Sequence, residues 1–251
     1  MKCSTRTTHS SCRIDEVFNH PNITAFAGLN MLVDFARQEL ELDKHLGSLS
    51  INKADHSRYL LSQEIEAQIY MRAAGLPRLN HFDEVEYDPL LPLKLGLDKL
   101  PSKSNLYRSL DRFDTPERVE ELADVNKTVL DHLVGNEHLA ILDIDTTVNT
   151  VHGEQEGASV DYNPRYRGRR SYQPLVAFEG HSGAAVYAQL RMGTSPTAEE
   201  KVDFYRQAKA QLPPGVKLGF VRADKAFASD TFFCALEEDG VHYARGCKSG
   251  F

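Results

Sequence analysis

The stretch ILDIDTTVNT, residues 141–150, has the composition of a β-strand and carries two aspartates one residue apart. Side chains alternate between the two faces of a strand, so Asp143 and Asp145 point to the same side, and the branched residues around them favour the extended conformation. Two carboxylates this close repel each other and need a cation, a shared proton or open water to coexist. The stretch therefore predicts either a metal or catalytic site, or a strand end at which one aspartate caps the chain and the other is solvated.

The composition of the whole chain indicates a globular protein. Its 251 residues suffice for one large or two modest domains, and 41% of them are hydrophobic and 26% charged. No stretch approaches the roughly 18 uncharged apolar residues of a membrane span, and the N-terminus lacks the apolar centre of a signal peptide. We therefore expect a cytoplasmic protein without a membrane partner. Because the formal net charge is −7, any contact with nucleic acid has to be made by a local basic patch.

Residues 1–135 carry helical patterns and are predicted to form an all-α N-terminal region. Apolar residues recur at helical spacing over residues 29–40 and 61–69. Thr115 and Pro116 form an N-cap followed by a first-turn proline, which predicts that a further helix begins there.

The segment LPSKSNLYRSLDRF, residues 100–113, predicts a short helix capped by Ser102. It presents the basic residues Lys103 and Arg108 beside Tyr107. A helix of this kind can read a DNA groove, and it can equally be a solvated amphipathic helix. The residues alone leave both interpretations open, so Lys103 and Arg108 are candidate DNA contacts.

From residue 136 the pattern changes to that of an α/β layer. Strand-like and helix-like runs follow in the order strand, hairpin, helix, strand, helix, strand. Asp145 lies on the first strand, and Asp224, in the segment VRADKAF, follows a later one. In open α/β sheets, ligands collect at the carboxyl ends of the strands. If these two strands are neighbours, the two carboxylates can hold a hard divalent cation such as Mg²⁺.

Between the two aspartates, the segment DYNPRYRGRRSYQP, residues 161–174, concentrates basic and aromatic side chains. The arginines are Arg165, Arg167, Arg169 and Arg170, and the tyrosines are Tyr162, Tyr166 and Tyr172. Guanidinium groups suit phosphate, and tyrosine faces stack on bases. In a chain of negative net charge the segment predicts a contact with nucleic acid, the alternative being a solvated basic loop.

Together these segments resemble a known family. LDIDTTVNTVHGEQEGASVDYNPRYRGRRSYQPLVAF, followed by VRADKAF and ALEEDGVHYARG, is similar to the group 1 DDE-domain transposases of bacterial insertion sequences, and the similarity continues into the helical N-terminal region. It implies an RNase H-like fold for residues 136–251 and a DNA-binding role for residues 1–135. Asp145 and Asp224 would be the catalytic, metal-binding carboxylates, with Mg²⁺ or Mn²⁺ as cofactor, and Asp143 a structural neighbour.

The resemblance also implies partners and a reaction. Double-stranded DNA would be the partner, both the terminal repeats of the element and the target, at the bacterial nucleoid. The reaction would be metal-dependent cleavage at the element ends and transfer of the 3′-hydroxyl to target DNA.

Some features depart from the family pattern. Gln173 stands where the family has histidine, and Lys225 and Ala226 replace a small residue and a glycine. The sequence also stops at Phe251, before the helix that would carry the family's third carboxylate, a glutamate. The resemblance therefore implies a truncated transposase with an incomplete RNase H-like sheet, able to bind DNA but not to complete strand transfer alone. Such a chain could pair with a second copy or with a full-length transposase.

Two other interpretations remain open. The chain could be a non-catalytic DNA-binding remnant. Alternatively, D-I-D-T-T matches the D-x-D-x-T opening of haloacid-dehalogenase-type phosphatases, in which Asp143 is the nucleophile and Asp145 the general acid. That class requires a helix directly after the motif and a later acidic metal pair, whereas this sequence continues with the strand-like VNTV and Asp224 has its next aspartate at position 230.

Overall fold

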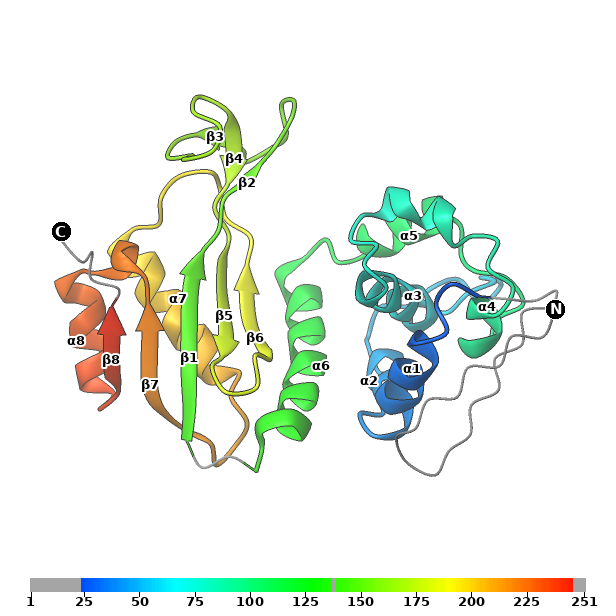
Figure 1. Ribbon diagram of the computed structural model, residues 1–251, viewed down its shortest axis with the longest axis horizontal. Coiled ribbons are helices and arrows are strands. Elements are labelled where there is room, and N and C mark those ends of the chain that lie inside the picture. The colour runs from blue at the N-terminus through cyan, green and yellow to red at the C-terminus, as the bar shows by residue number, and fades with distance from the viewer. Residues whose placement is uncertain (1–23, 137–138, 246–251) are drawn as a thin grey trace, which may run out of the picture. The chain divides into compact units, whose positions relative to one another are not determined.

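The computed structural model describes residues 24–136 and 139–245, and the chain divides into two compact units, Met1–Arg118 and Val119–Phe251. The boundary lies in the first turn of helix α6 (Pro116–Val134). The sequence pattern predicts this helix as part of the N-terminal region, whereas most of it belongs to the second unit. Figure 1 shows the described helices of the first unit and the sheets of the second.

The first unit is helical where it is described. Its elements are α1 (Leu29–Gln38), α2 (Leu42–Gly47), α3 (Leu61–Ala73), the 3₁₀ helix η1 (Leu79–Glu84), α4 (Leu91–Lys94) and α5 (Lys103–Leu110). The apolar residues of α3 are mostly buried. Gly75 follows α3 with a φ of +83° and donates its N–H to the carbonyl of Arg72, which ends this helix.

A charged side chain is buried at the centre of the first unit. Glu66 is 1% exposed and accepts hydrogen bonds from Nε and Nη2 of Arg37, at 3.0 and 2.7 Å, and from the hydroxyl of Tyr70, at 3.1 Å. Arg37 also donates to the carbonyls of Lys94 and Leu95. Because a buried charge is costly unless it is paired, this network holds α1, α3 and α4 to one another.

The second unit is built on a mixed five-stranded sheet. Its strands are β1 (Leu139–Thr146), β5 (Leu175–Glu179), β6 (Ala185–Gln189), β7 (Lys217–Ala223) and β8 (His242–Arg245), in the order β6-β5-β1-β7-β8. β5 is antiparallel to both β1 and β6, whereas β7 is parallel to β1 and β8 is parallel to β7. This is the strand arrangement of the RNase H-like fold, so the predicted α/β fold class is confirmed.

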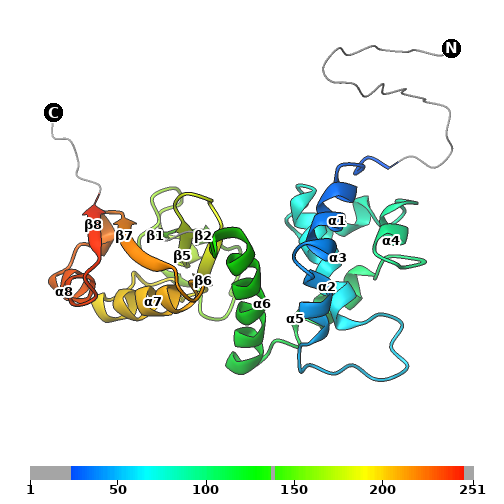
Figure 2. The same ribbon diagram turned by 90° about the horizontal axis from the view of Figure 1, so that it is seen from below.

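Helices α7 (Ala198–Ala210) and α8 (Asp230–Glu238) cover one face of the sheet (Figure 2). Leu142 and Ile144 of β1 point into the core that these helices form, together with Leu130 of α6. The opposite face carries the more exposed side chains of β1, including Asp143 and Asp145. Among the described residues, no helix combines the length and the apolar character needed to cross a membrane.

A second, smaller sheet was not predicted. It consists of β2 (Asn149–Thr150), β3 (Ser159–Val160) and β4 (Arg170–Tyr172), in the order β2-β4-β3. Figure 1 shows it beyond the carboxyl end of β1. These strands have two or three residues each, which is too short for an alternating pattern to be visible in the sequence.

A buried glutamate closes the hairpin between β5 and β6. Glu179 is 1% exposed, and its carboxylate accepts hydrogen bonds from the N–H groups of Ile141, His181 and Ser182 and from the hydroxyl of Ser182. Burial raises the pKa of Glu179, but these hydrogen bonds, those from Ser182 foremost, outweigh burial and leave the pKa below its usual value. The ionised carboxylate therefore stabilises the fold.

Replacing Glu179 by glutamine should lower the free energy of unfolding of the second unit by about 2 kcal/mol near neutral pH, because hydrogen bonds to a charged acceptor contribute about that much. The contribution is complete above the pKa of the unfolded chain, roughly 4.3, and is lost as the pH falls through the lowered pKa of the folded state. Urea unfolding of both proteins should therefore show a difference near pH 7 that shrinks near pH 3. A difference independent of pH would contradict this role.

Candidate metal site and nucleic-acid interface

Asp145 and Asp224 lie at the carboxyl ends of neighbouring parallel strands. β1 pairs with β7 in a register that places Ile144 opposite Ala223. Asp145 and Asp224 are the next residues along the two strands, whose axes in a sheet are about 4.8 Å apart. Both side chains are exposed. The topology thus brings together two carboxylates that are far apart in the sequence.

Asp143 is bound by an arginine. Arg222 of β7 donates from Nε to one carboxylate oxygen of Asp143 and from Nη2 to the other, the second bond at 2.5 Å. Gly180 makes room for this guanidinium, because a Cβ at that position would lie 2.7 Å from Nη2 of Arg222. Both oxygens of Asp143 are therefore occupied in a two-point ion pair. Of the two aspartates in the D-I-D motif, Asp145 is the one left with an available oxygen.

Each carboxylate of the candidate metal site is oriented by one backbone hydrogen bond. Oδ1 of Asp145 accepts from the N–H of Thr146 at 2.7 Å, and Oδ1 of Asp224 accepts from the N–H of Ala226 at 2.9 Å, which caps the short 3₁₀ helix η2 (Lys225–Phe227). Within the described part of the chain, neither Oδ2 has a hydrogen-bond or ion-pair partner.

Two available carboxylate oxygens at one sheet edge match the hard oxygen ligands that Mg²⁺ and Mn²⁺ prefer. The described residues contain no group of three or more histidine, cysteine, aspartate or glutamate side chains suited to holding a metal ion. Asp145 and Asp224 therefore fit a divalent cation as part of its ligand set, and further ligands have to complete the coordination.

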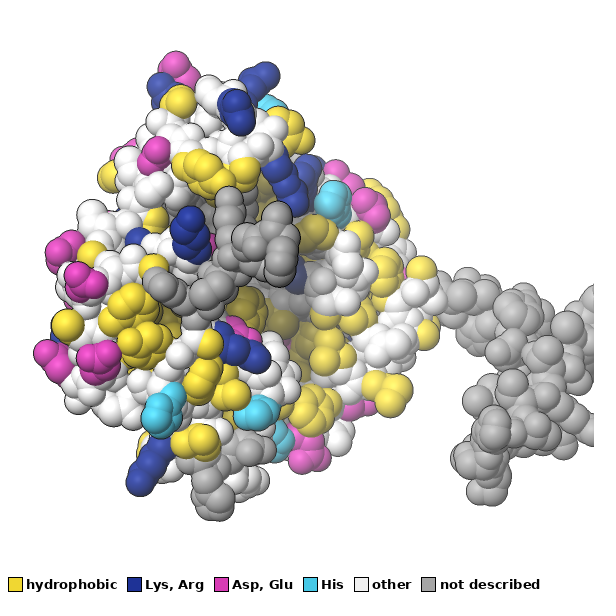
Figure 3. Space-filling view, turned by 60° about the vertical axis from the view of Figure 1, so that its left-hand side comes forward, with side chains coloured by type: hydrophobic (Ala, Val, Ile, Leu, Met, Phe, Trp, Pro, Cys, Tyr) yellow, Lys and Arg dark blue, Asp and Glu magenta, His cyan; other side chains and the backbone are white. Residues whose placement is uncertain are grey.

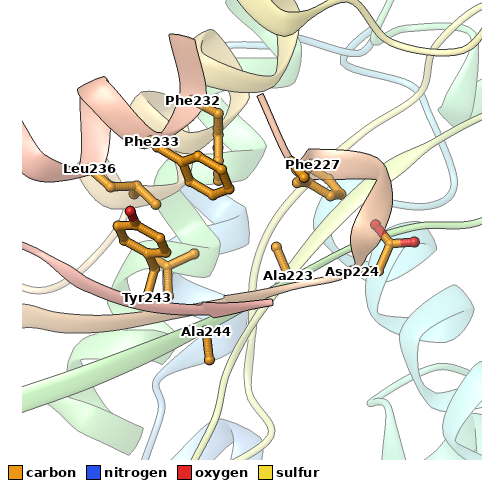
Figure 4. Close-up of a pocket in the computed structure, with 10 residues that line it drawn as sticks. Ala223, Asp224, Phe227, Phe232, Phe233, Leu236, Tyr243 and Ala244 are labelled. Atoms are coloured by element: carbon orange, nitrogen blue, oxygen red, sulfur yellow. The ribbon is translucent and has the colours of Figure 1, made fainter. Parts of the chain in front are cut away.

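A small apolar pocket lies beside Asp224 (Figure 4). Its lining includes Ala223, Phe227, Phe232, Phe233, Leu236 and Tyr243. The cavity volume of about 10 Å³ admits one water molecule at most. The pocket is therefore too small for a nucleotide, and its aromatic side chains pack η2 and α8 against the sheet, which fixes the turn that carries Asp224.

The arginine loop, residues 161–170, precedes and enters β4 of the small sheet. All four of its arginines, Arg165, Arg167, Arg169 and Arg170, are exposed. No ion pair or side-chain hydrogen bond of these four guanidinium groups occurs in the residues that the structure describes. Figure 3 shows Lys and Arg side chains at the upper end of the molecule, where the small sheet lies in Figure 1. The loop is thus an uncompensated basic surface beyond the carboxyl end of β1.

Two buried amides that sequence reasoning missed hold the arginine loop. Asn163 is 4% exposed, donates to the hydroxyl of Thr150 at 2.8 Å and accepts from the N–H groups of Arg165 and Tyr166. Gln173 is 3% exposed and donates to the carbonyls of Tyr162 and Gly193. Gln173, which stands where the sequence resemblance predicts a histidine, therefore has a structural role: its side chain holds the loop backbone in place. The Asn-Pro dipeptide was the available signal for the turn at Asn163, since asparagine side chains commonly accept from the backbone two or three residues on.

The family model described as Transposase DDE domain group 1 matches residues 6–250 of the sequence. The chain belongs to this DDE transposase family. The predicted resemblance to group 1 DDE-domain transposases is therefore confirmed over residues 6–250.

Among solved structures, a piggyBac transposase synaptic complex with hairpin DNA is 12% identical to this DDE-domain chain, with a TM-score of 0.41 over 86% of this chain and 49% of that chain. The Mos1 strand transfer complex is 13% identical, with a TM-score of 0.31 over 78% of this chain and 62% of that chain. The Drosophila P element transposase strand transfer complex is 11% identical, with a TM-score of 0.33 over 84% and 42%. The chain spans less than two thirds of each of these proteins. A search of curated protein sequences gives no match.

The local structure of this DDE-domain chain differs from what the phosphatase interpretation requires. Residues 147–150 continue without a helix into β2. Asp143, which would be the phosphoryl-accepting nucleophile, is held on both oxygens by Arg222. Both observations disfavour a haloacid-dehalogenase-type site.

The basic residues of α5 in the first unit are engaged within their own unit. Lys103 pairs with Asp83 at 2.8 Å, and its hydrogen bond to Asp83 raises the pKa of Lys103. Arg108 donates to the carbonyl of Ser104 and to the side chain of Asn105 on the same helix. Compared with the arginine loop, α5 offers fewer cationic groups without partners.

Proposed function

We propose that this chain acts as a DNA transposase, binding DNA through the arginine loop and a divalent cation, Mg²⁺ or Mn²⁺, through Asp145 and Asp224. The observation that carries the proposal is the shared location of these groups. The two aspartates lie side by side at the carboxyl ends of β1 and β7, and the exposed arginines lie beyond the same end of β1. A DNA backbone that contacts the loop can thus reach the two carboxylates.

The proposed reaction cleaves DNA at the ends of the element and joins the new end to target DNA. Water attacks a phosphodiester at the element end, the bond between phosphorus and the 3′ oxygen breaks, and a 3′-hydroxyl is released. This hydroxyl then attacks a phosphodiester of the target, the bond from that phosphorus to the 3′ oxygen of the target breaks, and the target strand leaves with a free 3′-hydroxyl. When bound, the cation would lower the pKa of the attacking hydroxyl or water and neutralise charge on the leaving oxygen. In this scheme Asp145 and Asp224 hold the cation, while the arginines bind the phosphates on either side.

The catalytic activity of this chain alone depends on whether the divalent cation has ligands other than Asp145 and Asp224. Two carboxylates leave a divalent ion of this type with several open positions. We therefore expect full DNA binding and weak cleavage by this chain alone, with a second copy or another transposase chain completing the site. A DNA-binding protein without catalysis is the second candidate, and the absence of a three-ligand cluster from the described residues favours it for the isolated chain.

Lys103 and Arg108 of α5 are proposed as secondary DNA contacts. Their side chains would have to exchange the bonds to Asp83, Ser104 and Asn105 for phosphate. Acting on chromosomal DNA, the protein would work at the bacterial nucleoid.

A nicking assay separates the two candidates. The substrate is a duplex made from the DNA that flanks the gene, incubated with Mg²⁺, with Mn²⁺ or with EDTA. Metal-dependent nicks that disappear in Asp145→Asn support a catalytic site in this chain. Binding without nicks under all conditions supports the non-catalytic candidate. Nicking that persists both in EDTA and in Asp145→Asn contradicts the proposed metal site.

Replacing the four loop arginines together by glutamine should weaken binding to duplex DNA of any sequence. The slope of log affinity against log salt concentration should also fall by up to about 3 to 4, because each phosphate contact contributes roughly 0.9. Fluorescence anisotropy with a labelled duplex at several KCl concentrations measures both quantities. Arg206→Gln, which removes an exposed arginine of α7, is the matched control and should leave the slope unchanged. An unchanged slope in the quadruple variant would show that DNA binds elsewhere.

A further inference from the structure

Two tyrosines of the arginine loop present their rings to solvent. Tyr162 is 67% exposed and Tyr166 is 59% exposed, and neither hydroxyl has a hydrogen bond within the described residues. Tyr172 behaves differently, because its hydroxyl donates to the carbonyl of Glu156 at 2.5 Å. Tyr172 therefore has a structural role in the small sheet, whereas Tyr162 and Tyr166 have no such role for their rings.

The backbone of each exposed tyrosine is fixed by a buried amide. The carbonyl of Tyr162 accepts from Gln173 at 3.2 Å, and the N–H of Tyr166 donates to Asn163 at 2.9 Å. The carbonyl of Tyr166 also accepts from the N–H of Arg169 at 3.2 Å. Ordering of a loop on binding costs free energy, and here most of that ordering is present before a ligand arrives.

Charge identifies the kind of ligand. The loop carries four exposed arginines without a carboxylate partner in the described chain, which suits a polyanion such as a nucleic-acid backbone. Phosphate groups bind the arginines but do not stack on the tyrosine rings, so the rings need a different part of the nucleic acid as their partner. In an intact duplex, base faces are stacked on one another, so a tyrosine can stack only on a base that is unpaired or terminal.

We propose that Tyr162 and Tyr166 form a stacking site for unpaired nucleobases, so that the loop selects DNA whose end carries unpaired bases over an intact duplex. This inference rests on the proposed DNA-binding function and defines the substrate class of the same site. The arginines bind the phosphates of the strand. The tyrosine rings, whose backbone is held by hydrogen bonds, stack on its exposed bases.

Three fluorescent DNA probes test the stacking site. The first is a blunt duplex, the second is the same duplex with a single-stranded overhang of about four nucleotides, and the third carries an overhang of equal length made of abasic sites. The second and third probes have the same number of phosphates, so a difference between them reports contacts to bases alone. We expect the protein to bind the base-bearing overhang more tightly than the abasic overhang, by roughly 5- to 150-fold for each stacked base.

Variants connect this difference to the two rings. Tyr162→Leu and Tyr166→Leu should each reduce the preference for bases and leave affinity for the abasic probe unchanged, and Tyr166→Phe should retain it because the ring is kept. Equal affinity of the wild-type protein for the base-bearing and abasic overhangs, or a preference that survives both leucine substitutions, would overturn the inference. The double variant Arg165→Gln with Arg167→Gln should lower the affinity of the protein for all three probes by a similar factor. If these arginine variants bind every probe normally, the proposed DNA-binding function fails instead.

Discussion

Replacing Asp145 or Asp224 by asparagine is expected to weaken the binding of Mn²⁺ by about a hundredfold or more. Each substitution removes a charged ligand, and the loss of a mere hydrogen-bond partner of a ligand already costs about 10- to 100-fold in metal affinity. The signal of free Mn²⁺ in electron paramagnetic resonance, recorded during titration with protein, measures this affinity without depending on DNA cleavage. Asparagine has nearly the same shape as aspartate, so the change isolates charge and ligand strength.

The double variant Asp143→Asn with Arg222→Gln is the matched control for this measurement. It removes an acid from the same strand and face, but it leaves the net charge of that face unchanged because the acid and its arginine are lost together. Mn²⁺ affinity close to that of the wild-type protein is expected. If the control weakens binding as much as Asp145→Asn does, Asp145 is not a distinct ligand and the proposed site is wrong.

Replacing Glu66 by alanine should destabilise the first unit by about 3 kcal/mol or more. The substitution leaves the guanidinium of Arg37 without its carboxylate and removes the acceptor of the Tyr70 hydroxyl, and breaking such a pair from one side costs about 3 to 5 kcal/mol. Urea unfolding followed by circular dichroism should show the transition of the first unit at a midpoint lower by about 1 to 3 M, given a typical urea dependence.

Two further variants define the cause of this loss. Glu41→Ala removes an exposed acid that also pairs with a lysine, Lys44, and should leave the midpoint almost unchanged because exposed ion pairs contribute little. Replacing Glu66 and Arg37 together by leucine and methionine should recover much of the stability, since no charge is then left unpaired. An equally low midpoint in the double variant would mean that packing of the side chains, and not the unpaired charge, causes the loss.

The ion pair between Asp143 and Arg222 gives the D-I-D motif a physical interpretation. One aspartate binds its neighbouring strand, and the other keeps an oxygen available at the strand end. The positive charge of Arg222 also offsets the repulsion between the two neighbouring carboxylates. The same pair connects β1 to β7 two residues before the proposed metal ligand on each strand.

Local patterns determined most of the second unit. The helix at 198–210 begins with the reciprocal hydrogen bonds between Thr197 and Glu200 that its first residues predict. Ser229 caps α8 and Gly240 ends it with a φ of +66°. These features depend on residues a few positions apart, so the sequence alone contains the relevant contacts. The family motifs likewise predicted the RNase H-like fold, because the first strand and the segment VRADKAF resemble those of DDE-domain transposases.

Tertiary structure alone decided which side chains are available to bind a ligand. Asp143 and Asp145 are equivalent in the sequence pattern, and only the parallel register of β1 with β7 places Arg222 against one of them. The three tyrosines of the basic segment are equally alike in the sequence, yet Tyr172 is bonded to Glu156 while Tyr162 and Tyr166 are exposed. The physical reason is that hydrogen bonds and ion pairs between residues distant in sequence depend on strand order and register, which no local spacing encodes.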